Sequence, residues 1–252
     1  MTSRRTHTVA LAAGAVVLAF TTAACGSSSS GGSPSGGSST ASGLPAFCGG
    51  QSGSGKVLVG AANFAENITL ADIYVDALNA CGYSASEKTF ASREAYYPLL
   101  KKGKIQAIPE YAATLTTFVV GTPSGDINTT VANLKAKLPA SLAVLNPAAA
   151  TDRNAFAVKT SLATANSITS LSDLAAYSKT HPLTLAGPPE CPSRPYCEPG
   201  LKKTYGMNIA HFRQTDPDGP LTRKALTSGK ADVGLVFSSD ADLPGLGLTV
   251  LT

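Results

Sequence analysis

Short apolar segments alternate with amphipathic segments along most of this 252-residue chain. KVLVGAA at 56–62 has the continuous apolar character of a buried strand. NITLADIYVDALNACGY at 67–83 follows it, with apolar residues, Tyr74 among them, at helical spacing and a stop at Gly82. A strand followed by a helix, repeated along a chain, predicts an α/β fold in which mainly parallel sheets are flanked by helices.

The same alternation continues to residue 147 and then starts again. Before this point we expect strands at 86–90, 105–108 and 141–147, and helices at 92–102, 111–120 and 127–139. After it we expect strands at 154–159, 183–187, 208–213 and 232–237, and helices at 167–181, 198–206 and 219–229. The restart predicts two lobes, 56–147 and 148–252, around a cleft, which is a favoured place for a small ligand.

The first 25 residues have the layout of a secretory signal. Arg4 and Arg5 precede an apolar stretch at 9–20 that is too short to span a bilayer comfortably. Thr-Ala-Ala-Cys at 22–25 is similar to a bacterial lipobox, which predicts a signal peptide at 1–24 and lipidation of Cys25. The alternative is an ordinary signal peptide in which this cysteine is incidental.

The segment that follows Cys25 consists almost entirely of Ser, Gly, Thr and Pro up to residue 55. Such a composition is typical of a flexible tether with too little apolar surface to fold. We therefore expect residues 25–55 to hold a folded body outside the cytoplasmic membrane, with the lipid as membrane anchor.

The charge of the chain is small once the signal segment is set aside. The formal net charge is +4, and it falls to +2 without Arg4 and Arg5. No cluster of Lys and Arg is present in the sequence, so nucleic acid is not the expected partner.

The cysteines after the signal segment are even in number, as is typical of disulfide bonding outside the cell. We expect two disulfides, Cys48–Cys81 and Cys191–Cys197. A zinc site is the alternative, but the spacing lacks a CxxC knuckle and only His181 and His211 add ligand nitrogens in this part of the chain. We expect no metal.

Motifs for catalysis are weak. GQSGSGKV at 50–57 resembles a phosphate-binding loop, but Val57 replaces the hydroxyl residue and the glycines precede the first strand. The sequence has no G-x-S-x-G elbow, and the scattered histidines do not suggest a Ser/His/Asp triad. We expect neither enzyme activity nor a cofactor, with a secreted hydrolase as the weaker alternative.

Four segments, taken in order, resemble the osmoprotectant-binding proteins, the solute receptors of ABC importers for glycine betaine, choline and carnitine. They are LVGAANFAENITLADIYVDALNACGY, IPEYAATL, SLSDLAAYSKTHPLTLAGPPECPSRPYCEPGLKKTYGM and LTRKALTSGKADVGLVFSSDADLPGLGLTVL. The similarity extends over about residues 56–251. It implies a two-lobed periplasmic-binding-protein fold of type II that delivers a quaternary ammonium compound to an ABC permease.

The resemblance also implies a cage of aromatic rings around the ligand. Tyr111 matches a cage tyrosine, Phe237 stands where another is usual, and Asp152 matches an acidic residue near the cage. Thr114 matches a hydroxyl that holds the ligand carboxylate, and Arg194 matches an arginine that reaches it from the second lobe. Tyr111 also follows an expected strand directly, where open α/β sheets bind ligands.

The chain departs from the family pattern at three places. Ala62 replaces a lysine, and Asn154 replaces a cage tyrosine, although Phe156 lies on the same face of the expected strand. Family members continue past the position of Thr252 with a further aromatic loop, so the sequence is either truncated at its C-terminus or a divergent member. The loss of the lysine favours a ligand without a carboxylate, such as choline.

Several residues have a simpler interpretation. We expect Tyr74 in the core, Tyr96 and Tyr97 as packing residues more than as cage faces, and Glu110 as an anion at a helix N-terminus. If Asn154 and Arg194 dominate the pocket, the ligand is another small polar solute such as an amino acid.

Overall fold

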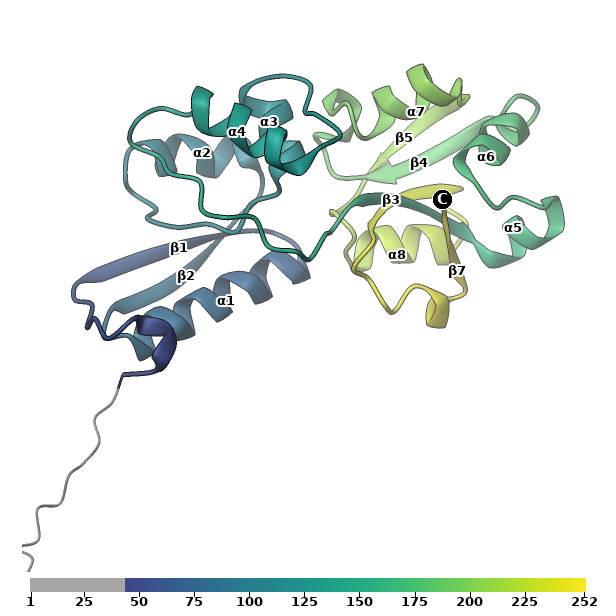
Figure 1. Cartoon of the computed structure of the whole chain (residues 1–252). Helices are drawn as coiled ribbons and strands as arrows, with labels where there is room; N and C mark the ends of the chain where they lie inside the picture. The colour runs from purple at the N-terminus through teal and green to yellow at the C-terminus, as the bar shows by residue number, and fades with distance from the viewer. Residues whose placement is uncertain (1–43) are drawn as a thin grey trace, which may run out of the picture. The chain divides into compact units, whose positions relative to one another are not determined.

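Two separate β-sheets organise residues 44–252, the part of the chain that this computed structural model describes (Figure 1). The expected signal peptide, Cys25 and nearly all of the tether lie outside the described residues. None of the helices in 44–252 combines the length and the apolar character needed to cross a bilayer.

The N-terminal lobe is built on two parallel strands. β1 (Lys56–Ala62) pairs with β2 (Ser84–Phe90) over its whole length. Figure 1 shows α1 on one face of this sheet, with α2, α3 and α4 on the other. These helices are α1 (Ala65–Ala80), α2 (Arg93–Lys101), α3 (Ala112–Val119) and α4 (Ile127–Lys137).

The period-2 alternation of β1 explains the two layers. Val59 and Ala61 are fully buried against α1, whereas Leu58 and Ala62 pack on the side of α2 to α4. The stripe of α1 that meets the sheet includes Asn67, Ala71, Val75 and Leu78.

The expectation that Tyr74 lies in the core is wrong. Its side chain is 40% exposed, and its neighbour Ile73 is 55% exposed. The buried stripe follows steps of three and four residues from Asn67, and Tyr74 lies one residue, about 100° of helix rotation, away from Val75.

Two strands expected in this lobe are reduced or missing. The segment at 105–108 contributes one bridge, Val59 to Ala107, because Pro109 then removes a backbone donor and ends the pairing. Residues 141–147 contain no strand and lead irregularly into the second lobe.

The C-terminal lobe contains a five-stranded sheet in the order β5-β4-β6-β3-β7. β4 is parallel to β5 and β6, whereas β3 runs antiparallel to β6 and β7. The strands are β3 (Asn154–Lys159), β4 (Leu183–Gly187), β5 (Ile209–Gln214), β6 (Val233–Phe237) and β7 (Leu248–Leu251). The helices are α5 (Thr160–Asn166), α6 (Leu171–Ser178), α7 (Glu198–Tyr205) and α8 (Pro220–Thr227).

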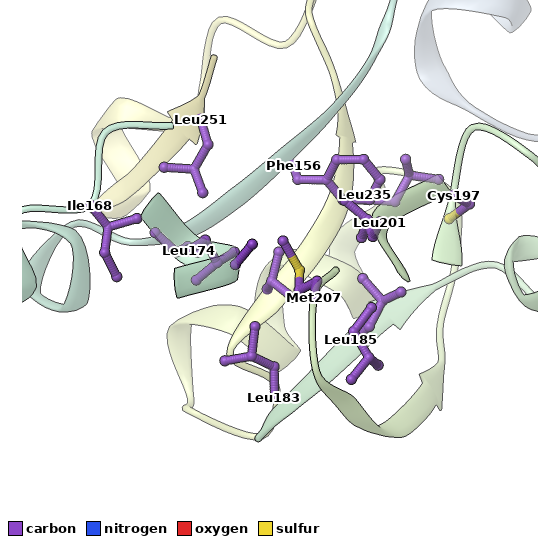
Figure 2. Close-up of a cluster of buried hydrophobic side chains, with 14 of the residues drawn as sticks. Phe156, Ile168, Leu174, Leu183, Leu185, Cys197, Leu201, Met207, Leu235 and Leu251 are labelled. Atoms are coloured by element: carbon purple, nitrogen blue, oxygen red, sulfur yellow. The ribbon is translucent and has the colours of Figure 1, made fainter. Parts of the chain in front are cut away.

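Each face of this sheet has its own hydrophobic core. Figure 2 shows the larger one, in which Leu185 and Leu235 of the sheet pack with Leu174 of α6 and Leu201 of α7. On the opposite face, Leu226 of α8 and small residues of β3 and β4 form the second cluster.

Both expected disulfides are present. Cys48–Cys81 ties the short 3₁₀ helix at Ala46–Cys48 to the end of α1. Cys191–Cys197 closes a short loop before α7, and both of its cysteines are buried in the core of the C-terminal lobe.

Candidate ligand-binding site

Three aromatic rings from both lobes meet at one place. The ring of Phe64 lies 5.7 Å from the ring of Tyr111 and 4.7 Å from the ring of Phe237, between ring centroids. Phe64 precedes α1, Tyr111 precedes α3, and Phe237 ends β6. The expected cage residues Tyr111 and Phe237 therefore contact the same third ring.

Phe64 is the ring that the sequence interpretation missed. It lies two residues after the end of β1, and residues outside the carboxyl end of a strand are well placed for ligands in open α/β sheets. This position was the available signal, because nothing else distinguishes Phe64 from a core phenylalanine.

Buried Asn67 fixes the two N-terminal segments that carry Phe64 and Tyr111. Its Oδ1 accepts the backbone N–H of Ala62 at 2.6 Å. Its Nδ2 donates to the carbonyl of Pro109 at 3.1 Å and contacts the Tyr111 hydroxyl at 3.5 Å. An amide side chain is suited to this place because it donates and accepts at once.

Two carboxylates lie beside the rings. The Tyr111 hydroxyl donates to Glu66 Oε1 at 3.0 Å, and Glu66 Oε2 is buried without a hydrogen-bond partner in the described residues. Asp152 Oδ1 accepts the backbone N–H of Ser239 at 3.1 Å and the hydroxyl of Ser238 at 3.3 Å.

These carboxylates influence each other and the tyrosine. Burial and then the charge of Glu66 raise the pKa of Asp152. Burial also raises the pKa of the Tyr111 hydroxyl, and Glu66 adds to this rise. Glu66 and Asp152 form no salt bridge within residues 44–252, so the surroundings of the rings are negative.

The nearest guanidinium in the N-terminal lobe already has a carboxylate partner. Arg93 donates to Glu110 through Nε at 2.9 Å and Nη2 at 2.8 Å, in a largely buried bidentate pair. Arg93 Nη2 also donates to Thr114 Oγ1 at 3.1 Å. Glu110 accepts the N–H of Tyr111 as well, so it does lie at the start of α3, but Arg93 is its main partner.

Arg194 is likewise paired. Its Nη2 lies 2.6 Å from Glu94 Oε1, and its guanidinium lies 5.4 Å from the ring centroid of Phe118. Glu94 and Phe118 belong to the N-terminal lobe, so Arg194 does reach across from the second lobe as expected. In this structure its charge is balanced by a protein carboxylate.

Asn154 stands opposite Phe237 in the register of β3 and β6. Its Nδ2 donates to the backbone carbonyl of Tyr196 at 3.0 Å. Phe156, two residues further on, is only 6% exposed and lies in the core shown in Figure 2, so it adds no ring to the site.

Tyr96 and Tyr97 are packing residues. Both are buried; the Tyr96 hydroxyl donates to Glu110, and the ring of Tyr97 meets the edge of Phe118 at 5.4 Å. Neither ring belongs to the group around Phe64.

Two open hollows of about 430 and 330 Å³ lie on the C-terminal lobe, away from the rings. The larger is lined along β5 by polar side chains such as His211 and Arg213, and the smaller by Lys159 and Thr160 among others. Neither combines aromatic faces with converging charges, so the group around Phe64 is the better candidate site.

The combination of rings and carboxylates is suited to a cation. Ring faces attract cations through the aromatic quadrupole, and the carboxylates add a Coulombic attraction. Two α/β lobes with such a group of side chains between them fit the small-solute binding proteins, and the chain has their periplasmic-binding-protein fold of type II.

Known proteins agree with this class. The family model for the substrate binding domain of ABC-type glycine betaine transport systems matches residues 55–252, and the chain belongs to this family. Its members are substrate-binding proteins of ABC importers, and they act outside the cytoplasmic membrane.

Solved structures support the fold. A crystal structure of a glycine betaine/carnitine/choline ABC transporter has 20% identity and a TM-score of 0.54, with 78% of this chain and 73% of that chain covered. Apo YehZ from Escherichia coli has 22% identity and a TM-score of 0.50, with 78% and 74% covered. No curated protein matches the chain.

Proposed function

We propose that this protein binds a quaternary ammonium osmoprotectant of the glycine betaine, choline or carnitine type and delivers it to the permease of an ABC importer. The observation that carries the proposal is the contact of Phe64 with both Tyr111 and Phe237. These rings come from different lobes, so one ligand can hold the two lobes together.

The chemistry of the ligand fits this group of side chains. A trimethylammonium group donates no hydrogen bonds, so its recognition depends on ring faces and buried area. Each face contributes about 0.5–2 kcal/mol, with the higher value where water is excluded. Glu66 and Asp152 strengthen the attraction for a positive charge.

The neighbouring charges favour choline over glycine betaine. A ligand carboxylate needs a basic partner, and Ala62 stands where the family has a lysine. Arg93 is paired with Glu110 and Arg194 with Glu94. The carboxylate of glycine betaine would compete with these glutamates, whereas choline has no carboxylate to place. Thr114 accepts from Arg93 and Asn154 donates to the carbonyl of Tyr196, and both are uncharged candidates for a further contact to a ligand hydroxyl.

Entry of the ligand requires a movement. The ring of Phe64 contacts the rings of both Tyr111 and Phe237, so the ligand must separate these rings before it is enclosed. A hinge motion of the two lobes about the irregular connection at 139–153 provides this separation. The closed, loaded form is then the one that docks on the permease.

Isothermal titration of the purified protein with choline, glycine betaine and carnitine tests the proposal. We expect choline to bind most tightly, and Tyr111→Ala or Phe237→Ala to weaken binding by about tenfold or more. Tyr74→Ala is the matched control, because Tyr74 is an exposed tyrosine of α1 outside the site. Undiminished binding in the Tyr111 and Phe237 variants would contradict the proposal.

We also propose that the mature chain begins at a lipidated Cys25, with residues 25–55 as tether and lobes at 56–147 and 148–252. Mass spectrometry of the mature N-terminus checks the lipid: an acylated Cys25 is expected, and Cys25→Ser should release the protein into the medium. Cleavage at another position with an unmodified Cys25 would contradict this part.

A further inference from the structure

A buried group of charged side chains lies directly behind Phe237. Asp218 Oδ2 accepts the backbone N–H of Phe237 at 3.0 Å. The carbonyl of Phe237 accepts the N–H of Asp240 at 3.2 Å. The N–H of Phe237 is therefore bonded to the side chain of Asp218, and its carbonyl is bonded to the backbone of Asp240.

The two aspartates share one guanidinium. Arg223 of α8 places Nη2 at 2.7 Å from Asp240 Oδ2 and Nε at 4.0 Å from Asp218 Oδ1. Asp242 is a third, more distant partner at 3.7 Å, and its side chain is 80% exposed. The side chains of Asp218 and Asp240 are only 6% and 5% exposed.

This group has more negative charge than Arg223 balances. Asp218 Oδ1, Asp240 Oδ2 and Arg223 Nε are buried without a hydrogen-bond partner of good geometry in the described part of the chain. Two buried carboxylates beside one cation can reduce their repulsion by taking up a proton.

Asp218 has no helix-capping role that would explain its position. Asp216, two residues earlier, accepts the N–H groups of Leu221 and Thr222 at the start of α8. Asp218 instead has a left-handed backbone with φ of 52°, and its side chain is directed to the end of β6. Asp tolerates this conformation better than most residues, but the conformation still requires support from its surroundings.

We propose that Asp218 is a positioning residue for the Phe237 ring, and that protonation of the Asp218–Arg223–Asp240 group loosens this ring and weakens ligand binding. The part that concerns binding rests on the proposed function. The physical reason is that a carboxylate is a stronger acceptor for the Phe237 N–H than a neutral carboxyl. The charged groups that face Asp218 are Arg223 on α8 and Asp240 and Asp242 after β6, with Asp216 on its own loop.

Asp218 gains and loses its proton in a pH range that binding experiments can cover. Burial raises the pKa of Asp218 to about 7, and the neighbouring Asp240 adds to the rise while Arg223 opposes it. The carboxylate therefore forms as the pH rises through about 7, and binding should tighten in the same interval.

Titrations with choline between pH 6 and pH 8 test the effect on binding. We expect the wild-type affinity to increase by about threefold to tenfold over this range, and Asp218→Asn to reduce the change to less than about twofold. Asp72→Asn is the control, because it removes an exposed carboxylate of α1 in the other lobe and should keep the wild-type pH dependence. An unchanged pH profile in Asp218→Asn would overturn the inference.

A second measurement does not depend on any ligand. In the ligand-free wild type, the amide resonance of Phe237 in ¹⁵N-resolved spectra should titrate with a midpoint near the pKa of about 7. A Phe237 amide that is insensitive to pH would overturn the inference even if Asp218→Asn does not fold. If no quaternary ammonium binds at any pH while this amide titrates, the proposed function fails and the positioning role of Asp218 stands.

Discussion

The guanidinium of Arg194 lies 2.6 Å from Glu94 Oε1, although the two residues are 100 positions apart and belong to different lobes. The two side chains are 22% and 53% exposed, and a partly solvated pair of this kind contributes about 1 kcal/mol or less to stability. Its larger consequence is for recognition. Glu94 is paired with the arginine for which the family resemblance implies a ligand carboxylate.

The first prediction therefore concerns Glu94→Gln. Removal of the carboxylate frees Arg194 for a ligand carboxylate, so the affinity for glycine betaine should rise by about threefold to tenfold relative to choline. Isothermal titration with both ligands measures this ratio. Asp72→Asn, an exposed acidic position on α1, is the control and should leave the ratio unchanged. An equal change in the affinity for both ligands would show that Glu94 affects the contact between the lobes and not the choice of ligand.

The second prediction concerns Glu66→Gln. The amide can still accept the Tyr111 hydroxyl, but the negative charge beside the rings is lost. We expect choline binding to weaken by about threefold to tenfold, which corresponds to about 0.7–1.4 kcal/mol. High salt should reduce this difference in choline affinity between wild type and variant only slightly, because Glu66 is half-buried. Equal or tighter choline binding in this variant would argue against a cation at the site.

Local pattern was enough to predict most of the elements and both disulfides. Local pattern failed where contacts between distant parts of the chain determine the structure. Residues 141–147 have strand-like composition but pair with no sheet, and Ala107 keeps a single bridge to β1. β7 is only four residues long and was not expected. Tyr74 fits an apolar stripe in sequence but lies beside the stripe that α1 buries.

For the site, the family resemblance singled out Tyr111 and Phe237, and both contact Phe64. The pairing of charges could not be predicted in the same way. Arg93–Glu110 and Arg194–Glu94 join residues that are 17 and 100 positions apart, and no spacing rule connects them. These pairs nevertheless decide which charges remain for a ligand.

The third prediction is that Asn67→Ala destabilises the N-terminal lobe. The side chain is fully buried, and its loss leaves the N–H of Ala62 and the carbonyl of Pro109 without their partner. We expect the free energy of unfolding to fall by about 2–4 kcal/mol in urea denaturation. Asn128→Ala, at an exposed position in the first turn of α4, should change it by less than about 0.5 kcal/mol.

The fourth prediction compares the two disulfides. Cys48–Cys81 closes 33 residues and Cys191–Cys197 closes 6. Loop entropy in the unfolded chain therefore predicts stabilisation of about 3.5 kcal/mol for the first and about 2 kcal/mol for the second. Paired Cys→Ser variants, compared by urea unfolding, measure both. The buried Cys191–Cys197 pair also leaves two polar hydroxyls in the core when it is replaced, so Cys→Ala variants are the better control there. A larger loss for the short loop even with alanine would contradict the entropic account.

The last prediction follows from the raised pKa of Asp218 and concerns stability. In the folded state this pKa is about 7, and in the unfolded chain it lies near the ordinary value of 3.8. Between pH 3.8 and about pH 7 the folded state therefore binds more protons than the unfolded state, so Asp218 makes the protein less stable as the pH rises through this interval. Asp218→Asn cannot release a proton, so its stability relative to the wild type should increase from pH 5 to pH 8, by roughly 1–3 kcal/mol. Urea unfolding at several pH values measures this difference. If the difference in stability between Asp218→Asn and the wild type does not vary with pH, the pKa of Asp218 lies in its ordinary range. Protonation of Asp218 then cannot control the position of Phe237 near pH 7.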